Sequence, residues 1–507
     1  MTNYLELKSA DLRLCFENLP EFNSTKDVSP YDKVIGQKRA VASIDLGLEM
    51  DSKEYNIFIS GKNGTGKTGY IVRKIEEYAQ KMPAPEDWCY VYNFEEPNSP
   101  MAISLKTGTA CSFKEEMNSF VKFLIKEVPV YFNSENYEKE KNNIVEKYNK
   151  IMLALSKELS GKAKVNNFDI RETTTGEFVF VPLKEGKEMS RDEFSELSSE
   201  EKDRIEALVG ELRLLSKEIL KETKELGKKM DEELKQLDDK IAESIISSRI
   251  KDIADKYAFN DQTGKYINSL KKDIIKNISI FMDEGEEKKD QDNSSLKRYD
   301  VNIIISNDSS LGAPVVFADS AQHGQLFGNI EYENKQGNLA TDFTLIKPGY
   351  LHKANGGFLL IKANELLSYA SSWETLKRCL NLGFIYMDSV KYTIDILPIS
   401  TLKPQNSLLL NYDMDFEKLF KIKAEFDSEI ENDSVNSANM VGFLRNYIEK
   451  NNLLHMTREA VKRLLQYSTR IAEDKNYYSA SMNQLLKIVD LSNFFARKEN
   501  SELIELK

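Results

Sequence analysis

A glycine-rich segment of eight residues constrains this chain more than any other feature of its sequence. It follows a short apolar run at 55–60, which is typical of a buried strand, and it precedes the helix-like stretch 69–81. Strand, loop and helix in this order are the setting of the phosphate-binding motif G-x-x-x-x-G-K-[ST], whereas a chance glycine-rich turn needs neither flank. The segment consists of Gly61, Lys62, Asn63, Gly64, Thr65, Gly66, Lys67 and Thr68. The sequence therefore predicts a P-loop within an α/β core.

The residue types of this segment explain how it would hold phosphate. Glycines let backbone N–H groups turn inward around phosphate oxygens without Cβ clashes, and the N-terminus of the following helix adds partial positive charge. Lys67 is expected to reach the β- and γ-phosphates, and the Thr68 hydroxyl is expected to ligate Mg²⁺. ATP or ADP, together with Mg²⁺, is the cofactor that follows from this pattern.

Further elements are predicted on both sides of the P-loop. Residues 34–50 indicate a turn followed by a helix, and 88–94 (WCYVYNF) is rich in the aromatic and β-branched residues that favour strands. Together with the strand and helix at the P-loop, this second strand predicts a parallel α/β core. From residue 434 the chain reads as successive helices, which predicts an all-helical C-terminal lid.

Two stretches dominated by Glu, Lys, Leu and Ile, 134–160 and 190–282, interrupt this core. Between them, residues 167–183 alternate around Thr175-Gly176 and predict a β-hairpin. The second stretch carries apolar residues at steps of three and four, which is the pattern of a heptad-like helical seam. The seam residues are Ile205, Leu208, Leu212, Leu215, Ile219, Leu226, Met230, Leu234, Leu237, Ile241 and Ile245.

The seam is expected to pack against an earlier helix and to form an antiparallel, coiled-coil-like arm. The expected contacts on that helix are Ile144, Tyr148, Ile151 and Leu155. The predicted domains are an N-terminal segment with the first half of the core at 1–133, the arm at 134–295, the second half of the core at 296–432, and the lid at 433–507.

Composition excludes several classes of protein. The net charge of -12 argues against a nucleic-acid partner bound through bulk charge. The four cysteines and three histidines are scattered without metal-ligand spacing, which favours reduced thiols and no metal centre: Cys15, Cys89, Cys111, Cys379, His323, His352 and His455. The charged N-terminus is no signal peptide, and no apolar run approaches the roughly 20 residues that span a bilayer. The chain is therefore expected to be cytoplasmic, with no membrane partner.

Beyond the P-loop, distinctive runs follow one another along the chain: VIGQKRA, DWCYVYNFEEPNSP, LFGNIEYE, TDFTLIKPGYLHKANGGFLLIKANELL, WETLKRCLNLG and LFKIKAEFDSE. Together with GKNGTGKT, this series resembles the bacterial Lon-related ATP-dependent proteases, in the branch whose AAA+ module contains a helical insertion. The resemblance covers nearly the whole chain and is more specific than the P-loop alone. It implies a homo-oligomeric ring in which ATP hydrolysis feeds unfolded polypeptide to a Ser–Lys peptidase domain.

Carried over residue by residue, the resemblance implies three sites. The P-loop matches fully, which supports Lys67 and Thr68 as nucleotide and Mg²⁺ ligands. Near the adenine, the family places the stretch that matches Ile35, Gly36 and Gln37. A pore-facing insertion would follow Leu326-Phe327-Gly328, where Phe327, Tyr332 or Phe343 either grips a peptide or belongs to the core.

Four departures from the family pattern weaken hydrolysis or proteolysis. Lys362 stands where an acid should coordinate Mg²⁺, and an ammonium cannot replace a carboxylate there, although Glu365 is a candidate substitute if the backbone shifts. Residues 393–416 are shorter than the family pattern, where a core strand and a polar residue that orients water are expected. In the lid, Ser481 stands in place of the arginine that touches the γ-phosphate. The chain reaches Lys507 close to where the peptidase domain is expected to begin, so that domain is expected to be absent.

Three functions remain open at this point. The first is an ATP-binding AAA+ module in protein quality control or assembly, with weak or absent hydrolysis, weak Mg²⁺ dependence and no peptidase activity of its own. The second is an active ATPase that unfolds client proteins for a separate peptidase. The third is a coiled-coil interaction protein in which nucleotide is structural. Lys362 and the missing arginine favour the first over the second, and the intact P-loop argues against the third.

Overall fold

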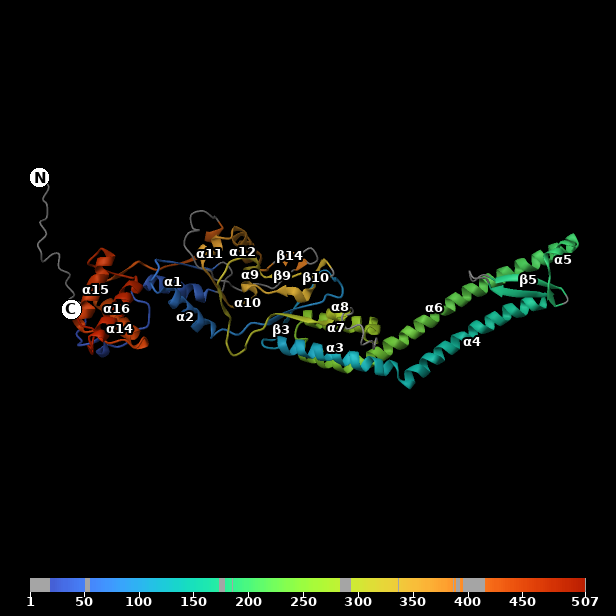
Figure 1. Cartoon of the computed structure of the whole chain (residues 1–507), viewed down its shortest axis with the longest axis horizontal. Helices are drawn as coiled ribbons and strands as arrows, with labels where there is room; N and C mark the ends of the chain where they lie inside the picture. The colour runs from blue at the N-terminus through green and yellow to red at the C-terminus, as the bar shows by residue number, and fades with distance from the viewer. Residues whose placement is uncertain are drawn as a thin grey trace, which may run out of the picture. The chain divides into compact units, whose positions relative to one another are not determined.

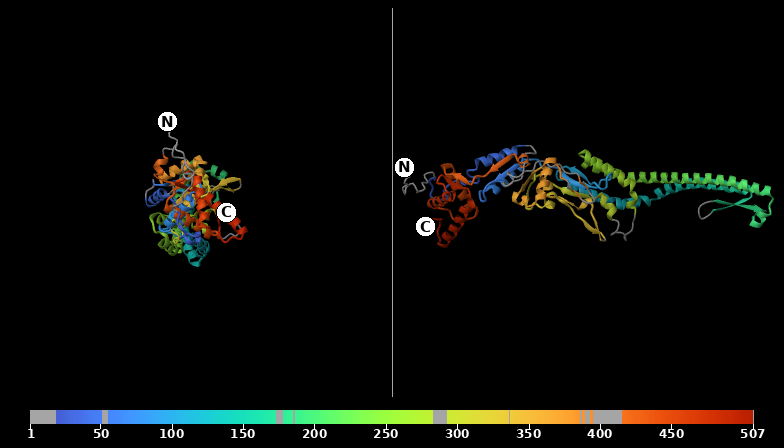
Figure 2. Two further views of the ribbon diagram at one scale, coloured as in Figure 1. Left: turned by 90° about the vertical axis from the view of Figure 1, so that its left-hand side faces the viewer. Right: turned by 90° about the horizontal axis from the view of Figure 1, so that it is seen from above.

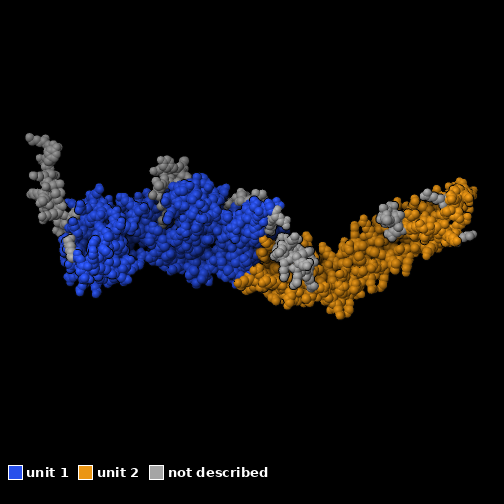
Figure 3. Space-filling model, viewed as in Figure 1, with its two compact units in different colours: residues 1–114, 301–507 blue, residues 115–300 orange. Residues whose placement is uncertain are grey.

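The computed structural model describes residues 19–50, 55–172, 178–184, 186–282, 293–335, 337–385, 387–388, 393–394 and 415–506. The chain divides into two compact units (Figure 3). Unit 1 combines Met1–Lys114 with Val301–Lys507, and unit 2 is Glu115–Asp300. Unit 2 is therefore an insertion between two halves of unit 1.

The P-loop of unit 1 joins a buried strand to a helix. The strand β1 (Ile57–Ser60) pairs in parallel with β16 (Ile422–Glu425), and the helix α2 (Lys67–Ala79) follows the loop. Both Ile57 and Ile59 pack in one hydrophobic cluster with α2 and with α1 (Lys38–Glu49), whereas Phe58 belongs to a second cluster. The strand is thus buried on both faces, which explains its uninterrupted apolar sequence.

A second parallel pair, β8 (Val315–Ala318) with β13 (Phe358–Ile361), shares both clusters with β1. The ring of Phe358, at the start of β13, packs against Tyr78 near the end of α2, with centroids 6.2 Å apart. Because the helix of a strand–loop–helix unit returns antiparallel to its strand, β13 begins at the edge opposite the loop and ends at the edge that carries it.

The strand predicted at 88–94 exists but is not part of this parallel arrangement. Its structural counterpart, β2 (Asp87–Val91), pairs antiparallel with β3 (Met101–Leu105) on one side and with β7 (Val301–Ile305) on the other. The expectation that β2 continues the parallel core is therefore wrong. Residue types identify a strand, but its partner is set by tertiary contacts.

The C-terminal part of unit 1 is a helical bundle. It contains α14 (Ser434–Lys450), α15 (Arg458–Ala472) and α16 (Met482–Lys498), which gather around one apolar core (Figure 1). Between the last two helices, β18 (Tyr477–Ser479) pairs antiparallel with β17 (Glu429–Glu431), the strand that leads from β16 into the bundle. The predicted lid is present, with this short strand added to its helices.

The shorter elements of unit 1 lie between β8 and α14. They are α9 (His323–Phe327), β9 (Asn329–Ile330), β10 (Glu333–Lys335), β11 (Asn338–Ala340), β12 (Ile346–Lys347), α10 (Tyr350–Lys353), α11 (Ala363–Leu367), α12 (Ala370–Leu382), β14 (Met387–Asp388), β15 (Thr393–Ile394) and α13 (Phe416–Leu419). The antiparallel pairs among them are β9 with β12, β10 with β11, and β14 with β15.

In unit 2, two long helices run side by side, α4 (Glu135–Val165) and α6 (Ser199–Tyr257) (Figure 2). Their direction is antiparallel, because the Tyr137 hydroxyl near the start of α4 donates to Asp238 far along α6, over 2.8 Å. Every residue of the predicted seam on α6 is buried or half-buried. On α4, Tyr148 is buried as expected, but Ile151 is 40% exposed and does not lie buried in the seam as predicted.

A small antiparallel sheet lies between the end of α4 and the start of α6 in the sequence. Its strands are β4 (Phe168–Glu172), β5 (Phe178–Lys184) and β6 (Lys187–Glu188). The predicted turn at Thr175-Gly176 lies outside the described residues. The remaining helices that reach or lie within this unit are α3 (Ala110–Phe132), α5 (Arg191–Ser195), α7 (Asp261–Lys276) and α8 (Asn293–Leu296). Across all described ranges, no helix is both long and apolar enough to cross a membrane.

Candidate nucleotide-binding site

The glycines of the loop hold backbone conformations that other residues rarely adopt. Gly61, Gly64 and Gly66 have φ values of +143°, +88° and +74°. A Cβ added to Gly61 would lie 2.8 Å from Cβ of Phe426, so that position also lacks room for a side chain. Gly66 is the N-cap of α2. The partial positive charge at the N-terminus of this helix therefore lies at the loop. This is the backbone cradle that the motif predicts.

Two side chains of the loop donate to the same carbonyl. Both the Thr65 hydroxyl and the Lys67 ammonium donate to the Lys62 carbonyl oxygen, each over 3.0 Å. Burial lowers the pKa of Lys67 below its ordinary value. A nearby phosphate would oppose this shift, because an adjacent negative charge favours the ammonium. Thr68 is exposed, which leaves its hydroxyl accessible to a metal ion.

A cavity of about 420 Å³ opens beside the loop. Gly64, Thr65 and Gly66 line one part of it, and Ile35 and Gln37 line another. The structure thus brings the loop together with the stretch expected near adenine. Gly36 does not line this cavity; a Cβ built on it would lie 2.7 Å from Cγ2 of Ile430, and its φ of +69° also suits glycine.

The amide of Gln37 has its own structural partner. Its Nε2 donates to the carbonyl of Asp427 over 3.0 Å, and its Oε1 accepts from the backbone N–H of Asp427 over 2.7 Å. These two bonds hold residues 35–37 against the segment between β16 and β17. Gln37 therefore shapes the wall of the cavity, with its amide already engaged.

The lid supplies a wall that the sequence alone did not reveal. Phe443 of α14 and Met482, Asn483 and Leu486 of α16 line the same cavity. Ser481, the residue in place of the expected arginine, is the N-cap of α16. A Cβ built on Gly64 would lie 3.1 Å from the Ser481 Oγ, so this side chain sits directly beside the loop. The family resemblance placed Ser481 near the phosphates, but it did not indicate that Phe443, Met482 and Leu486 line the cavity.

The Lys362 segment differs from the expected strand 359–365. β13 ends at Ile361, Lys362 is the exposed N-cap of α11, and Glu365 lies half-buried in the first turn of that helix. The strand is shorter than predicted because α11 begins directly after it. Lys362 consequently stands at the carboxyl end of β13, on the edge that carries the P-loop. Most of 393–416 lies outside the described residues.

The three aromatic side chains considered for a pore differ in exposure. Phe327 and Phe343 belong to the hydrophobic core, with 1% and 2% of their surfaces exposed, whereas Tyr332 is 42% exposed. Only Tyr332 among them is accessible to a polypeptide. It precedes the hairpin of β10 and β11, on which Leu339 is 76% exposed.

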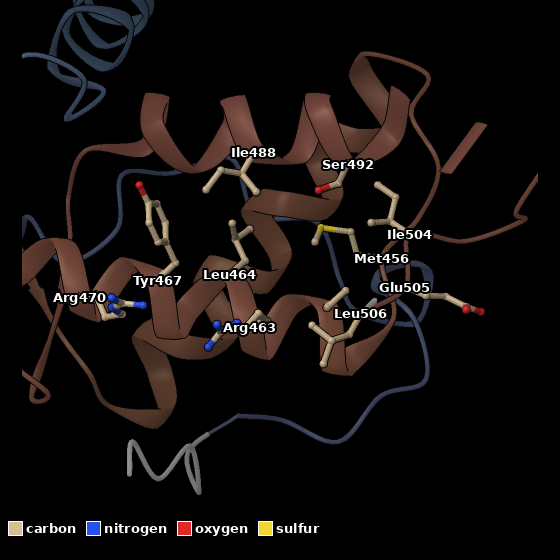
Figure 4. A pocket seen from close by; sticks show the side chains of 11 residues that line it. Met456, Arg463, Leu464, Tyr467, Arg470, Ile488, Ser492, Ile504, Glu505 and Leu506 are labelled. Atoms are coloured by element: carbon tan, nitrogen blue, oxygen red, sulfur yellow. The ribbon is translucent and has the colours of Figure 1, made fainter. Parts of the chain in front are cut away.

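Among the cysteines of the described part of the chain, only Cys111 is exposed. No group of three or more metal-ligating side chains occurs there, Cys89 and Cys379 are buried, and Cys15 lies outside it. A separate cavity of about 290 Å³ lies within the lid, where Leu464 of α15 and Ile488 of α16 point toward one another (Figure 4). No residue of the P-loop lines this lid cavity.

An α/β core with a P-loop, closed on one side by a helical lid, defines an AAA+ module. Comparison with models of protein families supports this class. Residues 311–408 match the LonB-like AAA domain, 87–120 match the Lon-like LonC helical domain, and 455–507 match the archaeal LonB AAA+ ATPase LID domain. The chain is a Lon-related AAA+ protein. Comparison with curated proteins gives no significant match.

The matched segments do not include the P-loop itself. Its assignment rests on the motif and on the geometry described above. The LonC helical match covers β2, β3 and the start of α3, and the lid match covers α15 and α16. AAA+ domains in general bind nucleotide with Mg²⁺, and Lon-like AAA+ proteins typically form oligomers.

Proposed function

We propose that this chain is an ATP- or ADP-binding AAA+ module with slow hydrolysis, which acts in protein quality control or assembly as part of a homo-oligomeric ring. The observation that carries the proposal is the cavity of about 420 Å³ lined by Gly64, Thr65 and Gly66 of the P-loop, by Ile35 and Gln37, and by residues of the lid. The loop supplies the phosphate contacts, and the apolar residues Ile35, Phe443 and Leu486 give a planar base an apolar environment.

The position of Lys362 supports slow hydrolysis. In P-loop NTPases the metal is held by the loop Ser/Thr together with a carboxylate on a neighbouring strand. Thr68 is available for the first role, but the residue that directly follows β13 at the loop edge is a lysine, Lys362. Loss of positioned charge from a phosphoryl-transfer site slows the reaction by orders of magnitude, whereas binding depends mainly on the loop.

Calorimetry with ADP and with ATP, each in the presence of Mg²⁺, tests the binding proposal. The Lys67→Ala variant should bind at least about tenfold more weakly, because a charge-assisted contact to phosphate in a partly buried site is lost. Lys81→Ala, which removes an exposed lysine beyond the far end of α2, is the matched control and should bind as the wild type does. Equal affinity in Lys67→Ala and Lys81→Ala would rule out the assignment.

A second function is favoured by the exposed Tyr332 and Leu339 near the β10–β11 hairpin. Exposed side chains of this size, one beside a hairpin and one on it, are suited to gripping an unfolded polypeptide. In that case the chain is an active unfoldase that serves a separate peptidase. Stimulation of ATP turnover by an unfolded protein such as casein would favour this alternative over the slow enzyme.

A further inference from the structure

A backbone hydrogen bond connects the lid directly to the P-loop. The N–H of Met482, the first residue of α16, donates to the Gly64 carbonyl over 3.0 Å. The side chains of Ser481 and Asn483 flank this contact, because a Cβ built on Gly64 would lie 3.1 Å and 3.6 Å from their nearest atoms. We call the Met482–Gly64 bond the latch.

The segment that precedes Met482 in the lid is hydrogen-bonded to the segment that connects β16 to β17. The N–H of Ala480 donates to the Ser428 carbonyl over 3.0 Å, immediately after the β17–β18 pair. The N–H of Phe426 in turn donates to Ser60, the residue before the loop, over 2.9 Å. The strand that ends at the loop, the connection into the lid and the start of α16 thus form a continuous set of backbone contacts.

The latch can open at small cost. Its donor is shared, because the Met482 N–H also lies 2.9 Å from the Ala480 carbonyl, so it keeps a partner when the lid moves away. Its acceptor belongs to Gly64, which is half-exposed and can accept from water instead. Opening therefore orphans neither group, and an unsatisfied buried group is the main penalty for breaking a hydrogen bond.

We propose that the latch couples occupancy of the P-loop to the position of the lid, in place of the arginine that Ser481 replaces. This inference rests on the proposed nucleotide binding. Phosphate that engages the N–H groups around Gly64 fixes the orientation of its peptide carbonyl, and the latch passes that orientation to α16. Met482 acts here as a positioning residue through its backbone, and nucleotide contact with Met482, Asn483 and Leu486 then depends on a closed latch.

Proline at position 482 removes the donor selectively. Proline is well tolerated at the first position of a helix, where its fixed φ suits the helix and its missing N–H costs no intrahelical bond. Ser481, with φ of -77° and ψ of 77°, is outside the helical region that a following proline excludes. Met482→Ala is the matched control, because it loses the same side chain from the cavity but keeps the N–H.

Hydrogen exchange with and without ADP and Mg²⁺ is the test. In the wild type and in Met482→Ala, ADP should slow amide exchange both at 61–68 and in the first turns of α16. In Met482→Pro, ADP should still protect 61–68 but no longer protect α16, and its affinity should fall about three- to tenfold relative to Met482→Ala, as for one net hydrogen bond.

Each other outcome has a definite meaning. Equal ADP protection of α16 in Met482→Pro and Met482→Ala overturns the coupling, as does wild-type protection confined to 61–68. Absence of ADP protection at 61–68 in the wild type contradicts the proposed function instead. If Met482→Pro loses protection throughout α15 even without ADP, Ser481→Leu decides the matter. The leucine side chain would press on Gly64 and separate it from α16, while the Met482 N–H is kept. If the latch connects the two sites, ADP should no longer protect α16 in this variant either.

Discussion

In the proposed site, a single residue, Lys362, is expected to slow hydrolysis without altering the architecture. Its side chain is exposed at the loop edge of β13, so its ammonium can turn toward water. At about 4 Å and an effective dielectric near 20, like unit charges repel by roughly 4 kcal/mol, which discourages this ammonium from remaining near a metal ion. The main consequence of a lysine at this position is that no carboxylate is present there to coordinate Mg²⁺.

The Lys362→Asp variant should therefore hydrolyse ATP faster, by at least about tenfold, because single preorganised groups in such sites contribute about 10²–10³-fold. Its turnover should also depend more strongly on Mg²⁺ than that of the wild type. Steady-state phosphate release across a Mg²⁺ titration measures both effects. Brisk wild-type turnover that requires Mg²⁺ and disappears in Glu365→Gln would show instead that Glu365 coordinates the metal.

His352 gives the fold a dependence on pH. The side chain is buried, its Nδ1 accepts from the Gly349 N–H over 3.1 Å, and burial lowers the pKa of His352 to about 4. A proton on Nδ1 would face that N–H, so the folded protein keeps the ring neutral. The unfolded chain, with a pKa near 6.5, takes up this proton as the pH falls.

The free energy of unfolding should consequently decrease as the pH falls from about 6.5 toward 4, and His352 should account for about 3 kcal/mol of the loss. In His352→Asn, the amide oxygen can replace Nδ1 as acceptor without titrating in this range. Urea unfolding at a series of pH values should therefore give a shallower acid-side decline for the variant. Curves of identical slope would mean that His352 does not titrate between the two states.

At the scale of elements, the sequence predicts a feature well where that feature depends only on residues adjacent in the chain. The positive φ angles of the loop glycines and the helix that follows them could be predicted, because both are local requirements, whereas the ligand roles of Lys67 and Thr68 remain predictions. The partners of β2 could not be predicted, since its residues only indicate that it is a strand. The exposure of Ile151 has a related cause, because a small error in helical phase moves a residue from the seam to the surface.

The seam between α4 and α6 offers a matched pair of leucines. Leu212 is 4% exposed and packs with Leu159 and Phe168, whereas Leu214, two residues away on α6, is 67% exposed. Leu212→Asp should destabilise unit 2 by a few kcal/mol, because it buries an unpaired charge, and Leu214→Asp should change stability by less than about 0.5 kcal/mol. Denaturation followed by circular dichroism compares the two. ADP affinity should be retained in both, and its loss in a Leu212→Asp protein whose arm remains helical would contradict the separation of the two units.

At the scale of the whole molecule, the candidate site combines segments that are distant in the sequence. Loop residues 64–66 and the lid residues Met482 and Leu486 line one cavity, although some 400 residues lie between them. Sequence motifs could not predict that these lid residues line the cavity, because the residues of α16 do not indicate which cavity its apolar face lines. The boundaries of the four predicted segments remain predictions, and unfolding of the complete chain is a way to examine them.

Each unit has hydrophobic clusters of its own, so the chain should unfold in two thermal transitions. ADP binds only unit 1 in the proposed arrangement, and at a hundred times its dissociation constant it should stabilise that unit by about 2.7 kcal/mol. Differential scanning calorimetry should then show one transition raised by several degrees and the other unmoved. The Leu212→Asp variant should do the reverse, lowering the transition that ADP leaves in place. A single transition that responds to both ADP and Leu212→Asp would show that the two units unfold as one cooperative body, and that the arm is not an independent insertion.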